Sequence, residues 1–232
     1  MRVLVTRPLE DATATAAQLK TLGHEAIVSP LLKVIPHTGP QIDLAGAQAV
    51  LATSANGVRA LAARTDNRSI PIFAVGPQTA AEAKAQGFSN IRSGDRDAVA
   101  LAEAVAQWTS PDKGVLVHAS GADGAGRLAA HLTAKGFTVR TETLYAIADQ
   151  ALSDEALAAM ANRALQAVML YSPRSARIFR DALLKADLSE AVGTLTAICI
   201  SPAAAEALSP LSFAGIRIAD APNQGALLAC LA

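Results

Sequence analysis

The chain has 232 residues, of which 51 % are hydrophobic and 17 % are charged, with 20 basic and 20 acidic side chains. This composition suits one large or two small folded domains, and the balanced charge without a basic run argues against a nucleic-acid-binding protein. No apolar run approaches the roughly 20 residues that span a bilayer, and a proline and acids follow the first short strand too soon for a signal peptide, so we expect a cytoplasmic protein without membrane attachment.

Short apolar strands alternate with helices along the first half of the chain. RVLVT (2–6) is typical of a buried strand, and the helix predicted over 11–23 ends at Gly23, a helix-stop signal. A long extended run then covers 25–36. Further strands are predicted at 49–53, 71–76 and 90–94, and further helices from Asn56, over 77–87 and near 97–108. Alternation at this pitch predicts a parallel sheet that is covered by helices on both faces.

The same order of elements begins again near residue 114. The matched pairs are GVLVHAS (114–120) with RVLVTRP (2–8), LYAI (144–147) with LLKV (31–34), AVMLYSPRSARIF (167–179) with AVLATSANGVRAL (49–61), and AICISPAAAEAL (197–208) with IFAVGPQTAAEA (72–83). An internal repeat of this kind indicates two copies of one five-stranded α/β unit.

Two arrangements of the copies compete. A simple tandem would divide the chain near residue 112, whereas a swapped arrangement would let the long runs 25–36 and 137–148 cross between lobes. Both runs are longer than a typical strand of about 5–6 residues, which favours the swap. We therefore expect lobe one to hold 1–36 and 148–232 and lobe two to hold 37–147. Each lobe is predicted as a five-stranded parallel sheet in flavodoxin-like order, and an antiparallel two-stranded ladder is predicted to join them.

Small polar turns follow the predicted strands, where open parallel sheets bind ligands. These turns lie at 6–8, 53–57, 76–79, 120–121, 172–175 and 201–202. The first N–H groups of a helix are free to bind carboxylates or phosphates, and Ser, Thr or Asn beside them either caps the helix or contacts the ligand. Both interpretations remain open for each residue, and together the turns favour an anion site.

The sequence lacks the common catalytic motifs. There is no nucleophile elbow, P-loop or zinc-protease motif, and GADGAG (121–126) lacks the dinucleotide-binding spacing. Cys199 and Cys230 are expected to be buried thiols. The four histidines, at positions 24, 37, 118 and 131, have no metal-ligand spacing. Tyr145, one of two tyrosines, would by default be a packing residue.

The ordered set of motifs is more informative than any one of them. VLVTRP, AVLATSANGVRAL, FAVGPQTAAEAKAQGF, VLVHASGADGAGRLAAHLTAKGFTV, LYAI, VMLYSPRSARIF and ICISPAAAEAL follow one another along the chain. In this order the chain resembles the uroporphyrinogen-III synthase family. The resemblance implies a lyase of haem biosynthesis that closes linear hydroxymethylbilane, with its eight carboxylates, into uroporphyrinogen III. The ring closes with loss of water and inversion of the last pyrrole ring, in a cleft between two α/β lobes. It implies no metal or organic cofactor, and we expect a monomer whose partner is the linear tetrapyrrole.

The resemblance also assigns some site residues by matched position. Tyr145 matches the family's tyrosine in the crossing strand and is expected to be the proton donor. The substrate-binding residues that match family positions are Ser54, Thr79, Gly126, Arg127 and Ser172. The predicted turns add Arg7, Asn56, Ser120, Gly121, Arg174 and Ser201, and Arg177 is a further candidate cation. One departure is the pair Ala203 and Ala204, where the family often has hydroxyls. This departure leaves open a non-catalytic two-lobed module that binds a tetrapyrrole or another small anion.

Overall fold

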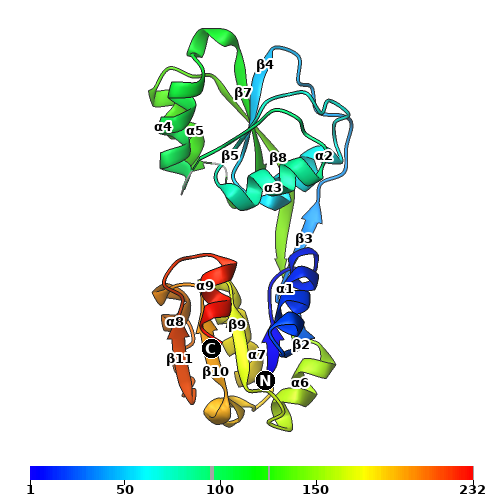
Figure 1. The fold of residues 1–232 in the computed structure, drawn as a ribbon, viewed down its shortest axis with the longest axis vertical. Helices are drawn as coiled ribbons and strands as arrows, with labels where there is room; N and C mark the ends of the chain where they lie inside the picture. Colours follow the sequence, from blue (N-terminus) through cyan, green and yellow to red (C-terminus); the bar gives the residue numbers. More distant parts are fainter. Residues whose placement is uncertain (95–96, 125, 232) are drawn as a thin grey trace. The chain divides into compact units, whose positions relative to one another are not determined.

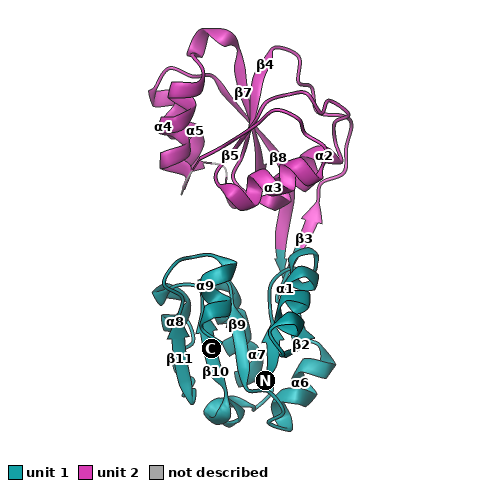
Figure 2. Cartoon of the chain, in the orientation of Figure 1, with its two compact units in different colours: residues 1–33, 148–232 teal, residues 34–147 magenta. Residues whose placement is uncertain are grey.

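The computed structural model describes residues 1–94, 97–124 and 126–231. The chain forms two compact units, one of Met1–Lys33 with Ala148–Ala232 and the other of Val34–Ile147 (Figure 2). Each unit contains a parallel sheet with helices packed on it (Figure 1). The prediction of an α/β fold with parallel sheets is therefore confirmed.

Unit 1 contains a five-stranded sheet in the described residues, in the order β11-β10-β9-β1-β2. All neighbouring strands in it are parallel. The strands are β1 (Arg2–Val5), β2 (Glu25–Val28), β9 (Ala167–Leu170), β10 (Thr196–Cys199) and β11 (Gly215–Ile218). The helices are α1 (Leu9–Thr21), α6 (Asp154–Ala161), α7 (Pro173–Lys185), α8 (Pro202–Glu206) and α9 (Gln224–Ala229), and a 3-10 turn, η2, covers Ser189–Thr194.

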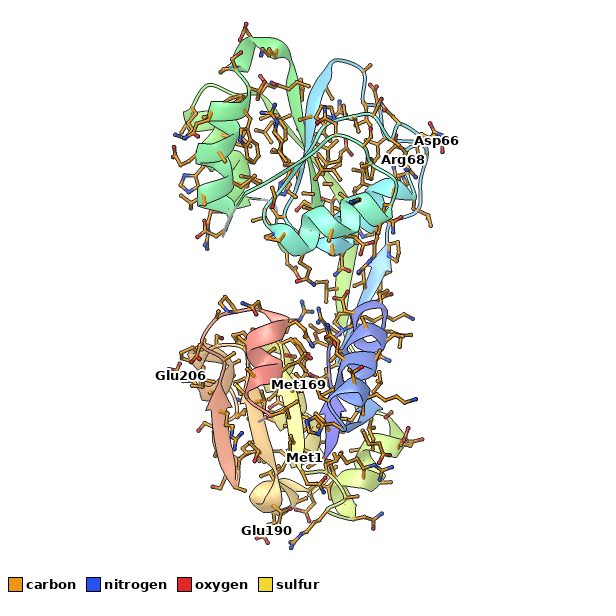
Figure 3. The ribbon with its side chains drawn as sticks, in the orientation of Figure 1. Met1, Asp66, Arg68, Met169, Glu190 and Glu206 are labelled. Atoms are coloured by element: carbon orange, nitrogen blue, oxygen red, sulfur yellow. The ribbon has the colours of Figure 1, made fainter. Side chains whose placement is uncertain are left out.

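Both faces of this sheet are apolar because helices cover both. Leu4 packs in one cluster with Phe179 of α7, whereas its neighbours Val3 and Val5 pack in another with α1 and α9. Met169 of β9 is fully buried in the second cluster, and Glu206 at the end of α8 is exposed (Figure 3). Strands buried on both faces read as continuous apolar runs, which is the pattern seen in the sequence.

Unit 2 contains a six-stranded sheet in the described residues, in the order β3-β8-β7-β4-β5-β6. The strands are β3 (Leu32–Pro36), β4 (Ala47–Ala52), β5 (Ile72–Ala74), β6 (Ile91–Ser93), β7 (Val115–Gly121) and β8 (Val139–Asp149). The helices are α2 (Ala55–Ala62), α3 (Pro77–Ala85), α4 (Ala98–Trp108) and α5 (Gly126–Ala134), with a 3-10 turn, η1, at Pro111–Lys113. Helices α2 and α3 cover one face of the sheet, and α4 and α5 cover the other (Figure 1).

The two long extended runs differ from each other in the structure. β8 is one strand of 11 residues, but the run 25–36 is divided into β2 and β3 by Ser29, Pro30 and Leu31. Pro30 has no backbone N–H to donate to a ladder, so the strand stops there. The N–H of His37 donates to Leu144 and that of Gln150 donates to Leu31, so the two runs are antiparallel. Because β3 adds to β8, the second sheet has one strand more than expected.

The internal repeat is visible in the sheets, but its predicted register is wrong by one residue at the first strand. Val3 pairs with Ala167 in unit 1, and Leu116 pairs with Ala49 in unit 2. Since Ala167 and Ala49 are matched in the repeat, Val3 corresponds to Leu116 rather than to Val115. The apolar run did not determine which residues of the two copies correspond, because both faces of these strands are buried. In the corrected register, Val5 of unit 1 corresponds to His118 of unit 2.

The cysteines are placed largely as expected. Cys199 is fully buried, and burial raises the pKa of its thiol to about 12. Cys230 is partly exposed rather than buried, and its Sγ donates to the carbonyl of Ala226. Within the described ranges, no helix is long and apolar enough to span a bilayer.

Helix α2 lies against β7 through a glycine. A Cβ at Gly57 would lie 2.7 Å from the carbonyl oxygen of Ala119, and neither backbone can move easily. We predict that Gly57→Ala lowers the free energy of unfolding by about 1–3 kcal/mol, the usual cost of overpacking, as measured by urea denaturation. The control is Gly193→Ala, because a Cβ at Gly193 has nothing within 4 Å. Equal midpoints for the two variants would contradict this account of the packing.

Candidate functional site

Three sequence-predicted residues meet at one edge of the sheet in unit 2. Ser54 follows β4, Gly121 ends β7, and Tyr145 lies in β8. The hydroxyl oxygens of Ser54 and Tyr145 are 2.8 Å apart. Tyr145 is only 7 % exposed, so the phenol is held inside the unit with a small part of its surface open. The strands are parallel, and their carboxyl ends therefore lie at the edge where such sheets bind ligands.

Ser54 also caps helix α2. Its backbone is extended, and its Oγ accepts the N–H of Gly57 at 3.0 Å. The hydroxyl thus satisfies a free helix donor and contacts the phenol at the same time. The capping interpretation of Ser54 is confirmed by its contact with Gly57, whereas its role as a substrate contact stays a prediction.

Gly121 allows the ring of Tyr145 to lie on the backbone of β7. A Cβ at Gly121 would lie 2.7 Å from both Cε2 and Cζ of the tyrosine. The pairing of β7 with β8 shifts between Ser120 and Gly121, which places Gly121 opposite Tyr145. The N–H of Ala122 then donates to the carbonyl of Tyr145 at 2.9 Å, and the Oγ of Ser120 donates to the carbonyl of Gly121 at 2.9 Å. The buried Ser120 hydroxyl therefore stabilises the end of the strand.

Asn56 and Thr79 lie in the first turns of α2 and α3. Oδ1 of Asn56 accepts from Arg59 at 2.9 Å, and Arg59 in turn forms a 2.7 Å ion pair with Glu82 of α3. Thr79 is buried in α3, which begins at Pro77 after an extended Gly76. These contacts fix α2 against α3 and orient both helix N-termini.

His118 is a buried titratable group of this unit. It is 0 % exposed, and this burial lowers the pKa of its imidazole. Nε2 lies 3.4 Å from Oγ1 of Thr53, whereas Nδ1 has no hydrogen-bond partner in the described part of the chain. No role was predicted for His118 from the sequence, because a single histidine in an apolar strand carries no motif.

Arg7 and Arg174 of unit 1 are already paired with carboxylates. Nη2 of Arg7 lies 2.9 Å from Asp11, Nη1 donates to Gln224 at 2.9 Å, and the guanidinium lies 4.8 Å from the ring centroid of Tyr171. Nε of Arg174 donates to Asp149 at 2.8 Å. Both predicted substrate cations are therefore partly neutralised within their own unit.

The remaining predicted residues occupy helix N-termini. Ser172 accepts the N–H of Ser175 at 3.0 Å in a capping box on α7, and Ser201 accepts that of Ala204 at 3.3 Å on the short α8. Gly126 and Arg127 begin α5 and are exposed. Across 1–94, 97–124 and 126–231, no group of three or more His, Cys, Asp and Glu side chains could hold a metal ion.

Comparison with known proteins identifies the family. Residues 13–229 match the family described as uroporphyrinogen-III synthase HemD. The chain belongs to the uroporphyrinogen-III synthase family. It is accordingly an enzyme of haem biosynthesis, a lyase whose substrate is a tetrapyrrole. No curated protein sequence matches the chain significantly.

Solved structures of the family share the fold. Uroporphyrinogen-III synthetase from Helicobacter pylori has a TM-score of 0.64 at 17 % identity, over 100 % of this chain and 98 % of that chain. A mutant uroporphyrinogen III synthase from Thermus thermophilus has a TM-score of 0.52 at 18 % identity, over 100 % of this chain and 97 % of that chain. Identities this low mean that these structures support the fold, while the family match carries the function.

The buried imidazole predicts a loss of stability in acid. Because burial lowers the folded-state pKa of His118, the unfolded chain binds more protons below about pH 6.5, and the free energy of unfolding falls as pH drops through that range. We predict that the free energy of unfolding falls more steeply with decreasing pH in the native chain than in His118→Val, which carries the residue found at the matched position of unit 1, Val5. Urea denaturation at a series of pH values measures this slope. His131→Gln, at an exposed histidine, is the control and should keep the native slope. Parallel curves for the native chain and His118→Val would contradict the prediction.

Proposed function

We propose that the chain closes hydroxymethylbilane into uroporphyrinogen III with Tyr145 as the proton donor. The observation that carries this assignment is the 2.8 Å contact between the Tyr145 and Ser54 hydroxyls at the carboxyl edge of the unit 2 sheet. The family match supports the reaction itself. A phenol has a reference pKa near 10, so it holds its proton at neutral pH and can give it to a leaving group.

The difficult step is the loss of the terminal hydroxyl of the bilane, because hydroxide is a poor leaving group. In the proposed mechanism, Tyr145 protonates that oxygen while the carbon–oxygen bond breaks, which releases water and leaves an electrophilic azafulvene. The substituted carbon of the last ring attacks it to give a spiro intermediate. The ring is then inverted, the macrocycle closes, and the proton lost from the closing ring returns to the phenolate. One water is released overall, and no cofactor takes part.

Helix N-termini and a few cations would hold the substrate's carboxylates. A neutral chain cannot attract a polyanion by bulk charge. The N-terminal turns of α2, α3 and α7 offer backbone N–H groups beside Asn56, Thr79 and Ser172. Exposed Arg127 and Arg177 lack hydrogen bonds and ion pairs to other described residues, so they are better candidates than Arg7 or Arg174.

We further propose that the predicted lobes, 1–36 with 148–232 and 37–147, are the functional lobes of a monomeric cytoplasmic enzyme that binds no nucleic acid. The sheet orders β2-β1-β9-β10-β11 and β8-β7-β4-β5-β6 support a flavodoxin-like unit in each. In the repeat, β1 of unit 1 corresponds to β7 of unit 2, and β2 corresponds to β8. The zero net charge supports the absence of a nucleic-acid partner.

One observation favours a second candidate, a non-catalytic binder. Ala203 and Ala204 of α8 stand where the family often has hydroxyls, and Ala204 is also the residue that matches Thr79 of α3. Freshly prepared hydroxymethylbilane separates the candidates. The synthase gives the type III macrocycle faster than the unaided reaction gives type I, whereas a binder leaves the spontaneous type I product unchanged.

Removal of the Tyr145 hydroxyl tests the acid role. A positioned general acid usually contributes about 100-fold to 10,000-fold, but the bilane also cyclises unaided, so most of the enzyme's work is to impose geometry. We therefore predict that Tyr145→Phe loses about 10-fold to 100-fold in turnover and remains folded. Tyr171→Phe is the matched control, because that phenol contacts Met169 within unit 1. Full activity of Tyr145→Phe would make Tyr145 a packing residue.

Single arginines should contribute modestly to binding. A contact at an exposed helix N-terminus is worth about 0.3–1 kcal/mol, and about 1.4 kcal/mol is one decade in affinity. We predict that Arg127→Ala weakens substrate binding about tenfold or less, as measured by KM. Lys185→Ala removes the same charge from the far end of α7 and should leave KM unchanged. A thousandfold loss in Arg127→Ala would instead reveal a discrete arginine clamp.

A further inference from the structure

We propose that Ser54 and Gly121 are positioning residues that set where the Tyr145 hydroxyl lies and where its proton points. The proposal rests on the proposed role of Tyr145 as proton donor. It changes the role expected for Ser54 and Gly121, which the sequence placed among the substrate contacts. Each residue acts on the phenol through a different physical contact.

Ser54 sets the direction of the hydrogen bonds. A serine hydroxyl has one proton and two acceptor sites, and Oγ of Ser54 accepts the N–H of Gly57 at 3.0 Å. Either hydroxyl can donate across the 2.8 Å between Ser54 Oγ and Oη of Tyr145, and in the proposed arrangement Ser54 is the donor. With that acceptor site on Oη filled, the phenol's proton points away from Ser54. The chain of donors therefore runs from Gly57 N–H through Ser54 and Tyr145 to the substrate oxygen.

The same arrangement connects the phenol to the positive end of a helix. Ser54 is the N-cap of α2, an eight-residue helix, and free N–H groups at such an end favour negative charge. When Tyr145 gives up its proton, the phenolate keeps the hydrogen bond from Ser54, which becomes charge-assisted and which the helix terminus strengthens. The phenolate would otherwise be expensive in a site that is 7 % exposed.

Gly121 sets the position of the ring. A Cβ there would lie 2.7 Å from Cε2 and Cζ and 3.0 Å from Oη of Tyr145, so any larger residue must displace the hydroxyl end of the ring. The opposed positions of Gly121 and Tyr145 in the ladder make this contact unavoidable. Glycine is needed for space, because a side chain at this position meets the catalytic end of the phenol.

The other copy of the repeat separates capping from positioning. Ser172 corresponds to Ser54 and caps α7 with the same 3.0 Å bond, so the serine is present in both copies. Unit 1 has Leu32 in place of Tyr145, and in the corrected register it has Pro8 in place of Gly121. The glycine thus occurs in the copy that carries the phenol, which is the pattern expected if it accommodates the ring.

The positioning can be measured directly, because the chain has only two tyrosines. Label tyrosine Cζ with carbon-13 and record its NMR signals in the full chain. We expect Ser54→Ala and Gly121→Ala to shift the Tyr145 signal and to leave that of Tyr171 in place. Ser153→Ala removes the N-cap of α6, another eight-residue helix, and Gly193→Ala adds a methyl in open space, so neither should shift the Tyr145 signal. A stationary Tyr145 signal in both site variants overturns the proposal.

Kinetics then separate positioning from a general structural role. Both site variants should lower kcat by about 10-fold to 100-fold, as for Tyr145→Phe, with little change in KM. In the Tyr145→Phe background, Ser54→Ala and Gly121→Ala should cost little more, because residues that act through one hydroxyl are not additive. If Ser54→Ala and Gly121→Ala each lower kcat in the Tyr145→Phe variant by as large a factor as in the native chain, the proposal is contradicted.

Two further outcomes are decisive. If Gly121→Ala is too unstable to assay, Gly121→Ala with Tyr145→Leu should recover the stability of Tyr145→Leu alone, because the clashing ring is gone; failure to recover it contradicts the assigned contact. If Tyr145→Phe is fully active while Ser54→Ala still shifts the Tyr145 signal, the acid role fails and the positioning of the ring stands. Failure of the proposed function is thereby distinguished from failure of this inference.

Discussion

Parallel pairing of β4, β7 and β8 is the constraint on which the site depends. β4 and β7 end at the same edge of the sheet, and Tyr145 of the longer β8 pairs with Gly121 at the end of β7, so Ser54, Gly121 and Tyr145 meet although they are far apart in the chain. The 2.8 Å contact between two hydroxyls follows from that edge, from the cap of α2, and from the shift in register at the end of β7. In the proposed arrangement, the loss of any one of these releases the phenol from its position.

The two copies of the repeat use the same local structure differently. Ser54 and Ser172 both cap a helix after a buried strand, and both are satisfied by a backbone N–H at 3.0 Å. In unit 2 the capping hydroxyl also contacts a phenol, whereas unit 1 has a leucine at the matched position. A duplicated fold therefore provides helix N-termini in both units, while Tyr145, the proposed proton donor, is present in one of them.

The arginines illustrate why charge is a weak guide to binding when it is read from sequence. Arg7 lies in a predicted turn, yet Asp11 one helical turn later neutralises it and Tyr171 covers its face. Arg174 is paired with Asp149, which no sequence motif connects to it. The pair of Arg174 with Asp149 joins residues that only the fold brings together, whereas the pair of Arg7 with Asp11 is local, so a cation in the right turn is not thereby a free cation.

The sequence by itself determined the α/β class, the parallel sheets, the internal repeat and the helix caps, because each of these depends on local periodicity or on a residue and its near neighbours. It also indicated Tyr145 and Ser54 as separate candidates. The tertiary structure decided the register of β7 within the repeat, the division of 25–36 at Pro30 and the burial of His118. So was the reason for Gly121: a glycine at the end of a strand looks like any turn residue until the ring of Tyr145 is placed 2.7 Å from its absent side chain. Contacts between strands that are distant in sequence depend on register and on space, and an apolar run carries no record of either.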